Sequence, residues 1–187
     1  WSVAVMALAA LGLAPALWRL LRDDAAGAVS DLGRWLLLAV WVGAMPACWI
    51  ALRAQVPWSA MVGAILAVKC NDIGAYFAGH AFGRHRMAPW ISPAKTWEGF
   101  AGGALASIAA GAWVGSTLPE GMGHGIAFGA CAAVLGPFGD LAESILKRHA
   151  GAKDSGTMLP GMGGALDVLD SLLPTAPAAL WLLGARS

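Results

Sequence analysis

Long apolar stretches separated by short polar segments run through the whole chain. Trp1–Trp18, Gly99–Pro119 and Gly121–Gly139 contain no charged residue. A helix that crosses a membrane needs about 20 mostly apolar residues. The pattern therefore predicts an all-α fold, a polytopic transmembrane helix bundle of about six spans. We expect these spans at roughly 2–19, 35–53, 57–82, 99–118, 122–146 and 166–184.

The composition excludes an ordinary soluble domain. Of the 187 residues, 58% are hydrophobic and only 12% are charged, whereas soluble domains carry about 25% charge. A soluble helical protein would need polar faces at helical spacing, and the segments 99–118 and 122–139 have none. The same composition excludes disorder, which requires low hydrophobicity and high charge. The ten tryptophans fit a chain that meets a bilayer interface.

The basic residues alternate from one connecting segment to the next. The segments 19–34, 83–98 and 147–165 hold three lysines or arginines each, whereas the second connection holds only Arg53 and the fourth, 119–121, holds none. Basic loops stay on the cytoplasmic side of a membrane. The count therefore predicts that the first, third and fifth connections are cytoplasmic, and the alternation supports the six predicted spans.

Charged residues gather in two stretches, Lys69–Glu98 and Asp140–Asp170. Ionisable groups at membrane depth are costly unless they are paired or face water, so they are candidates for function. Lys69 and Asp72 are three residues apart, and either a self-contained ion pair or a functional role explains them. Asp140 and Glu143 have the same spacing, and their repulsion would be relieved by a divalent cation.

The segment 147–170 combines basic residues, glycines and paired carboxylates. Glycines allow backbone N–H groups to approach phosphate, basic side chains match its charge, and carboxylates suit Mg²⁺. A solvated loop followed by an Asp-capped helix would explain Asp167 alone but not the whole set. The segment 83–98 is also basic, and its Ser92, Lys95 and Thr96 are candidates for phosphate binding, although a basic loop is expected from the topology alone.

These motifs resemble the phosphatidate cytidylyltransferase (CDP-diacylglycerol synthase) family. The family signature reads Ser-x-hydrophobic-Lys-Arg, then Lys-Asp-x-small, Pro-x-His-Gly-Gly and Asp-Arg-x-Asp. Its positions are matched here by Ser144, Lys147, Arg148, Lys153, Asp154, Gly156, Gly163, Gly164, Asp167 and Asp170. The segments NDIGAYFAGHAFGRHRMAP, SPAKTWEGFAGG and GPFGDLAES are also similar to family segments. Two positions differ, because Met162 stands where the signature has His and Val168 where it has Arg.

The resemblance implies transfer of a cytidylyl group from CTP to phosphatidate, giving CDP-diacylglycerol and pyrophosphate, with Mg²⁺, alone or together with a second cation, as the cofactor. The motifs predict catalytic roles for Asp140, Asp167, Lys95, Lys147 and Arg148, substrate binding by Ser92, Thr96, Lys153, Asp154, Asn71, Asp72 and Asp170, and metal binding by Asp140, Asp167 and Glu143. We expect one membrane domain over 1–187, with N-terminal helices in 1–56 and the catalytic motifs in 57–187. Because residue 1 is Trp and family members have more N-terminal helices, we also expect an N-terminally truncated chain.

The expected location is the bacterial inner membrane, with the active site facing the cytoplasm. The expected partners are CTP, phosphatidate and the lipid bilayer, without nucleic acid, and the resemblance also implies a homodimer. Two alternatives stay open. In the first, the chain is a non-catalytic homologue or one of altered specificity, which the changes at Met162 and Val168 would explain. In the second, it is a transporter whose intramembrane charges line a path. A transporter would often have an internal repeat, which the sequence lacks.

Overall fold

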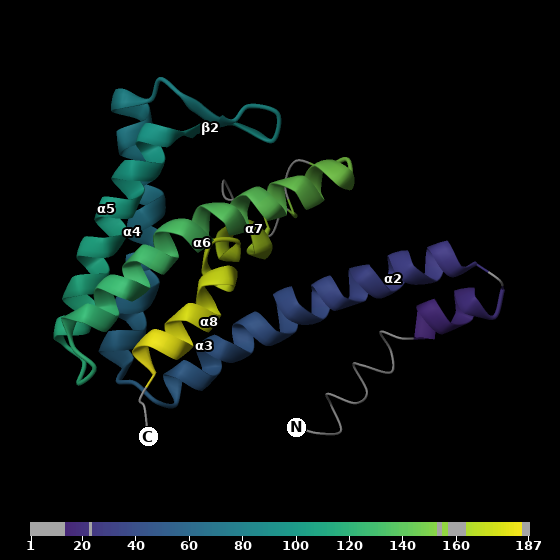
Figure 1. Ribbon diagram of the computed structural model, residues 1–187, viewed down its shortest axis with the longest axis horizontal. Helices are drawn as coiled ribbons and strands as arrows, with labels where there is room; N and C mark the ends of the chain where they lie inside the picture. The colour runs from purple at the N-terminus through teal and green to yellow at the C-terminus, as the bar shows by residue number, and fades with distance from the viewer. Residues whose placement is uncertain (1–13, 23, 153–154, 157–163, 185–187) are drawn as a thin grey trace. The chain divides into compact units, whose positions relative to one another are not determined.

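The computed structural model describes residues 14–22, 24–152, 155–156 and 164–184, most of them in helices (Figure 1). The chain divides into two compact units, Trp1–Ala44 and Met45–Ser187. In the first unit, helix α2 (Ala25–Leu38) continues into a short π-helix, η1 (Ala39–Ala44). The expected division of the chain at residue 56 stays a prediction.

Helix α2 begins within the segment that was predicted to be a connecting loop. The Asp24 side chain accepts a hydrogen bond of 2.8 Å from the Gly27 N–H and thereby caps the helix. This hydrogen bond and the Arg19 guanidinium lower the pKa of Asp24. Arg19 and Arg34 both pair with Asp31, at 2.6 and 3.2 Å. The predicted loop 19–34 is therefore wrong from Ala25 onward, because Asp31 and Arg34 pair with each other one turn apart on α2 instead of interrupting it.

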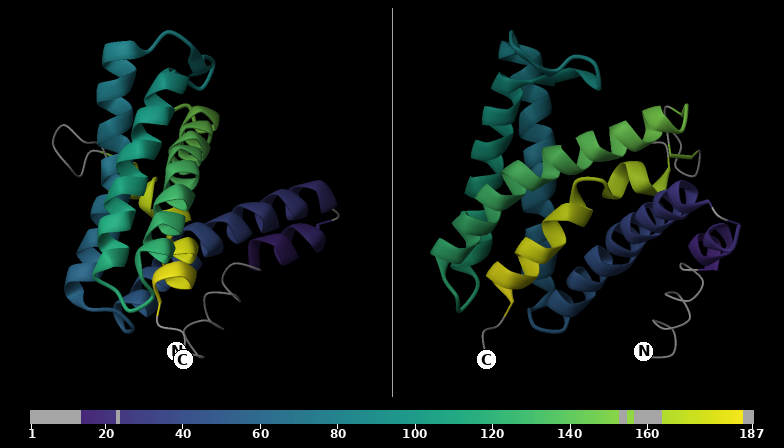
Figure 2. Two further views of the ribbon diagram at one scale, coloured as in Figure 1. Left: turned by 60° about the vertical axis from the view of Figure 1, so that its left-hand side comes forward. Right: turned by 45° about the vertical axis from the view of Figure 1, so that its right-hand side comes forward.

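The second unit is a bundle of helices with one short hairpin. Its helices are α3 (Met45–Arg53), α4 (Trp58–Phe82), α5 (Trp97–Ser116), α6 (Met122–His149), α7 (Ala165–Leu169) and α8 (Leu172–Leu183). Helix α5 packs along α4 on one side and α6 on the other, and α8 packs against α6 and α3 (Figure 1 and Figure 2). The hairpin lies at one end of α4 and α5, and the turn between α5 and α6 lies at the other end.

Strands β1 (Arg86–Ala88) and β2 (Ser92–Thr96) form the antiparallel hairpin between α4 and α5. Pro89 and Pro93 exclude a continuous helix here. The hairpin leads directly into α5, because the Thr96 hydroxyl accepts the Gly99 N–H at 3.1 Å and caps the helix. It therefore holds the candidate residues of β2 at the N-terminal end of α5.

Glycines bring the helices of the second unit into close contact. Gly111 and Gly115 of α5 face Gly125 and Gly129 of α6, where any side chain would overlap the backbone of the neighbouring helix. The Ser107 hydroxyl donates a hydrogen bond of 3.0 Å to the Gly129 carbonyl across the same interface. Such small-residue contacts are typical of helix packing in membranes.

Among the described residues, five helical stretches are long and apolar enough to cross a membrane. They are Ala25–Arg53, Trp58–Phe82, Trp97–Ser116, Met122–His149 and Ala165–Leu183. The protein is an integral membrane protein, and the predicted all-α transmembrane fold is confirmed. Five of the predicted spans agree with these helices, and most of the remaining one, 2–19, lies outside the described residues.

Candidate active site

A cavity of about 390 Å³ lies in the second unit, among α4, the hairpin, the start of α5, α6 and the α7–α8 turn. Its polar lining consists of Lys69, Asn71, Asp72, Ser92, Lys95, Thr96, Asp140, Asp167 and Asp170. Apolar side chains, including Tyr76, Met87 and Phe100, line the remainder. Segments that are up to about a hundred residues apart in the sequence therefore place charged side chains around one space.

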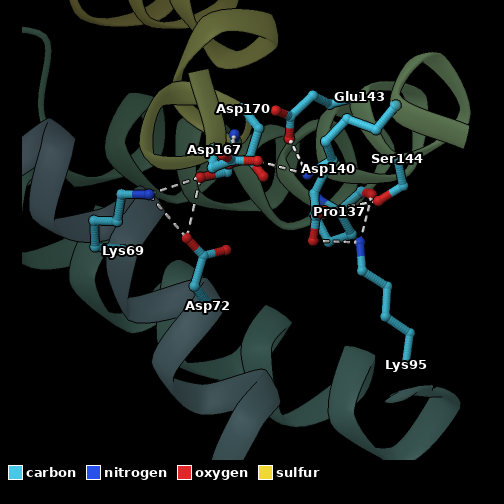
Figure 3. A network of polar contacts seen from close by, with 11 residues as sticks. Lys69, Asp72, Lys95, Pro137, Asp140, Glu143, Ser144, Asp167 and Asp170 are labelled. Atoms are coloured by element: carbon cyan, nitrogen blue, oxygen red, sulfur yellow. Dashed lines mark hydrogen bonds and ion pairs between the residues drawn. The ribbon is translucent and has the colours of Figure 1, made fainter. Parts of the chain in front are cut away.

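Three carboxylates meet beside this cavity. Asp140 and Glu143 are one turn apart on α6, and Asp170 approaches from the turn between α7 and α8 (Figure 3). One oxygen from each carboxylate lies within 4.8 Å of the other two. Glu143 is fully buried, and within the described part of the chain its Oε1 has no hydrogen-bond partner. Three clustered carboxylates, one of them buried with a free oxygen, form a donor set for a hard divalent cation.

Lys95 connects the hairpin to this cluster. Its ammonium lies 2.7 Å from Asp140 Oδ2 and donates a hydrogen bond of 3.0 Å to the Pro137 carbonyl. The Lys95 side chain is only 20% exposed. A partly buried cation is thus held at the cavity wall next to a carboxylate, where it can also contact an anionic ligand.

Lys147 connects α6 to α7. Its ammonium lies 3.2 Å from Glu143 and 2.6 Å from Asp167. Asp167 is engaged further, because its Oδ2 accepts hydrogen bonds from the Ser155 N–H at 2.9 Å, the Ser155 hydroxyl at 2.7 Å and the Gly164 N–H at 2.6 Å. The Asp167 carboxylate therefore fixes the start of α7 and the Lys147 ammonium.

Lys69 forms a second polar group on the α4 side of the cavity. Its ammonium donates to Asp72 Oδ2 at 3.1 Å (Figure 3). It also donates to the Ser171 hydroxyl at 2.9 Å and to the Val168 carbonyl at 3.0 Å. The Lys69–Asp72 ion pair, one of the two explanations that the sequence left open, is present, but Lys69 also reaches the α7–α8 turn. Asp72, a predicted substrate-binding residue, therefore lies in this group.

The neighbouring Asn71 is buried, and neither its amide nitrogen nor its amide oxygen has a hydrogen-bond partner within the described residues. It lies between α5 and α6, where Gly103 and Gly136 leave room for its side chain. Ser92 and Thr96 also line the cavity, although the Thr96 hydroxyl already caps α5. These three predicted substrate-binding residues are thus brought to one cavity.

Other predicted residues lie apart from the cavity or outside the description. Arg148 is exposed near the end of α6 and does not line the cavity. Lys153, Asp154 and Met162 lie outside the described residues. At Val168, where the family signature has Arg, the backbone carbonyl accepts the hydrogen bond from Lys69.

The family assignment follows from comparison with known proteins. The profile of the cytidylyltransferase family matches residues 1–185. The chain belongs to this family. It is 44% identical over 137 residues to a phosphatidate cytidylyltransferase of Brucella suis, and the match covers 72% of the chain and 50% of that protein.

Two other cytidylyltransferases are similar over a longer stretch. The phosphatidate cytidylyltransferase of Mycobacterium bovis is 38% identical over 167 residues, which cover 83% of the chain and 51% of that protein. The one of Pseudomonas aeruginosa is 41% identical over 163 residues, or 81% of the chain and 60% of that protein. The chain therefore spans about half of the length of the curated relatives it matches.

The structure of this family member gathers a set of carboxylates that differs from the predicted metal ligands. The predicted set was Asp140, Glu143 and Asp167, whereas the structure gathers Asp140, Glu143 and Asp170. The assignment of Asp167 as a metal ligand stays a prediction. The predicted site did not include Lys69 or Ser171, which join α4 to the α7–α8 turn. The three-residue spacing of Lys69 and Asp72 was the available signal for the lysine, and none in the sequence indicated Ser171.

Proposed function

We propose that the chain carries the catalytic centre of a phosphatidate cytidylyltransferase, which transfers a cytidylyl group from CTP to phosphatidate. The observation that carries this proposal is the carboxylate cluster of Asp140, Glu143 and Asp170 beside a cavity that Lys95 lines. Membership of the cytidylyltransferase family and the names of the similar proteins supply the reaction. Phosphoryl chemistry of this kind depends chiefly on positioning and charge neutralisation.

The carboxylate cluster fits Mg²⁺. Three carboxylates that would otherwise repel one another, with one buried oxygen that lacks a partner, supply the hard oxygen ligands that this cation prefers. Asp140, Glu143 and Asp170 would hold the metal, and a second cation would share the same acidic region. When bound, Mg²⁺ neutralises triphosphate charge and makes the α-phosphorus more electrophilic.

The lysines would orient the phosphate groups. Lys95, held between Asp140 and the Pro137 carbonyl, is placed to contact the triphosphate, with Ser92 as a hydroxyl donor from the same strand. Lys147, which Asp167 keeps in position beside Glu143, would add positive charge next to the carboxylate cluster. A phosphatidate oxygen attacks the α-phosphorus of CTP, a new P–O bond forms, and the bond from the α-phosphorus to the β-phosphate oxygen breaks. Pyrophosphate leaves with the electron pair of that bond.

The lipid substrate would approach through the apolar part of the cavity wall. Tyr76 lines the cavity and is 68% exposed, and Met87 and Phe100 line it from the hairpin and α5. Acyl chains would stay among apolar side chains and lipid while the phosphate reaches the lysines.

The basic connections predict that this end of the bundle faces the cytoplasm at the bacterial inner membrane. A homodimer in the bilayer is part of the same proposal.

The deciding experiment measures pyrophosphate release and CDP-lipid formation by the intact protein in detergent with CTP, phosphatidate and MgCl₂. Asp140→Asn should lower turnover by about 100-fold or more, because it removes a metal ligand and the partner of Lys95. The matched control is Asp24→Asn, which also removes a carboxylate but keeps a good helix cap. Turnover that is unchanged in Asp140→Asn would contradict the site, and CTP binding without pyrophosphate release by the natural protein would support the non-catalytic alternative.

A further inference from the structure

Lys69 is unusual among the cavity lysines because its ammonium is fully engaged within the protein. An ammonium has three N–H donors, and those of Lys69 are used by Asp72, Ser171 and the Val168 carbonyl at 2.9–3.1 Å. To contact a phosphate it would have to break one of these bonds. The geometry therefore favours a structural task at the site over direct contact with substrate.

Ser171 connects Lys69 to the carboxylate cluster through hydrogen bonds. It is 1% exposed, and its hydroxyl accepts from Lys69 and donates to Asp72 Oδ2 at 3.0 Å. Its backbone N–H donates a hydrogen bond of 2.6 Å to Asp170 Oδ1. Because one residue makes all of these contacts, the position of its backbone and the orientation of the Asp170 carboxylate are fixed together.

Lys69 makes a second hydrogen bond to the same region of the chain, to the Val168 carbonyl. Val168 lies in α7 two residues before Asp170, and Ser171 follows Asp170 directly. The two contacts of Lys69 on this turn thus lie before and after Asp170 in the sequence. The other two carboxylates, of Asp140 and Glu143, both come from α6. The α7–α8 turn that carries Asp170 is therefore held by Lys69 of α4, whereas its partners in the cluster come from α6.

We propose that Lys69 is a positioning residue that fixes Asp170 for cation binding. This inference rests on the proposed function, because it assumes that the carboxylate cluster holds a divalent cation. Without the ammonium, Asp72 would lose its ion pair and keep, among the described residues, the hydrogen bond from the Ser171 hydroxyl, and the Val168 carbonyl would lose its donor. The α7–α8 turn would then be free to move away from α4 and α6, and Asp170 would move with it.

The test measures Mn²⁺ binding by the intact protein in detergent, with MnCl₂ alone and without CTP or lipid, by electron paramagnetic resonance. Lys69→Met keeps the length of the side chain but removes its charge and donors, and should weaken Mn²⁺ binding at least tenfold, the usual effect of losing a group that orients a ligand. Lys69→Arg restores a cation with several donors and should keep the Mn²⁺ affinity within about twofold of that of the natural protein. Arg53→Met is the matched control, since Arg53 also donates to a backbone carbonyl but lies away from the cavity.

A second variant and a kinetic measurement keep the test independent of folding. Ser171→Ala removes one hydroxyl and should weaken Mn²⁺ binding about three- to fivefold, in the same direction as Lys69→Met. Both variants should lower kcat more than they raise KM for CTP, because Lys69 does not contact the nucleotide. Equal Mn²⁺ affinity in the natural protein, Lys69→Met and Ser171→Ala would overturn the positioning role and leave the proposed function intact. A natural protein that binds no Mn²⁺ would overturn both.

Discussion

Asp140 and Asp170 are 30 residues apart in the sequence, but their carboxylates lie in one cluster. This contact determines which carboxylates form the candidate metal site. Asp170 shares the cluster with Asp140 and Glu143, whereas Asp167 is hydrogen-bonded to Lys147, Ser155 and Gly164. Asp167 and Asp170 lie in the same Asp-x-x-Asp motif. The structure therefore separates two neighbouring carboxylates into a candidate metal ligand and a residue that positions a lysine.

We expect Asp170→Asn and Asp167→Asn to have different effects. Asp170→Asn should weaken Mn²⁺ binding about tenfold or more, because it removes one of three charged ligands. Asp167→Asn should change Mn²⁺ affinity less than about threefold but lower the melting temperature, because Lys147 loses an ion pair of 2.6 Å that is largely buried.

The measurement compares titration with MnCl₂ and thermal unfolding for each variant in the same detergent. Each variant acts as the control for the other, since both replace a carboxylate by an amide in one motif. A greater loss of Mn²⁺ affinity in Asp167→Asn than in Asp170→Asn would instead support the ligand set expected from the sequence.

The helices could be predicted from the sequence more completely than the contacts between them. The uncharged runs predicted five spans to within a few residues at most ends, because burial in lipid requires length and apolar character, both visible in one dimension. The i,i+3 spacings placed Lys69 beside Asp72, and Asp140 beside Glu143. The approach of Ser171 to Lys69, and of Asp170 to Glu143, depends on how α8 meets α4 and α6, for which local sequence carries no signal.

Helix α6 approaches α8 closely at Gly139, next to Asp140. A side chain at Gly139 would overlap Pro174 and the Asp170 carbonyl. We expect Gly139→Leu to push the helices apart, to separate Asp140 from Asp170, and to cost about 1–3 kcal/mol of stability. Mn²⁺ affinity and turnover should fall together with the melting temperature.

Gly123→Leu provides the matched control for this change. Gly123 lies in the same helix, but a Cβ atom there would meet no atom of a neighbouring element within 4 Å. Leucine also favours a helix over glycine by up to about 1 kcal/mol. Gly123→Leu should therefore keep both stability and Mn²⁺ affinity, and equal effects of the two substitutions would contradict the close contact at Gly139.

At the scale of the whole molecule, the low fraction of charged residues indicates a membrane protein, and the positions of those residues indicate where the candidate active site lies. The hairpin at one end of α4 and α5 carries basic residues, whereas the turn between α5 and α6, residues 117–121, carries no Lys or Arg. The cavity is lined from the hairpin and from the α7–α8 turn. If the basic connections are cytoplasmic, a water-soluble nucleotide reaches the cavity from the cytoplasm and a lipid reaches it from the bilayer.

This orientation can be tested by labelling single cysteines in intact cells and in inverted membrane vesicles. In a background with Cys48, Cys70 and Cys131 replaced by serine, Trp90→Cys places a thiol at the hairpin tip, where Trp90 is 82% exposed. Pro119→Cys places one at the exposed turn between α5 and α6. A membrane-impermeant maleimide should label Trp90→Cys only in inverted vesicles and Pro119→Cys only in intact cells with a permeable outer membrane. The reverse pattern would put the cavity on the outer side, where CTP is not supplied by the cell, and would contradict both the orientation and the proposed reaction.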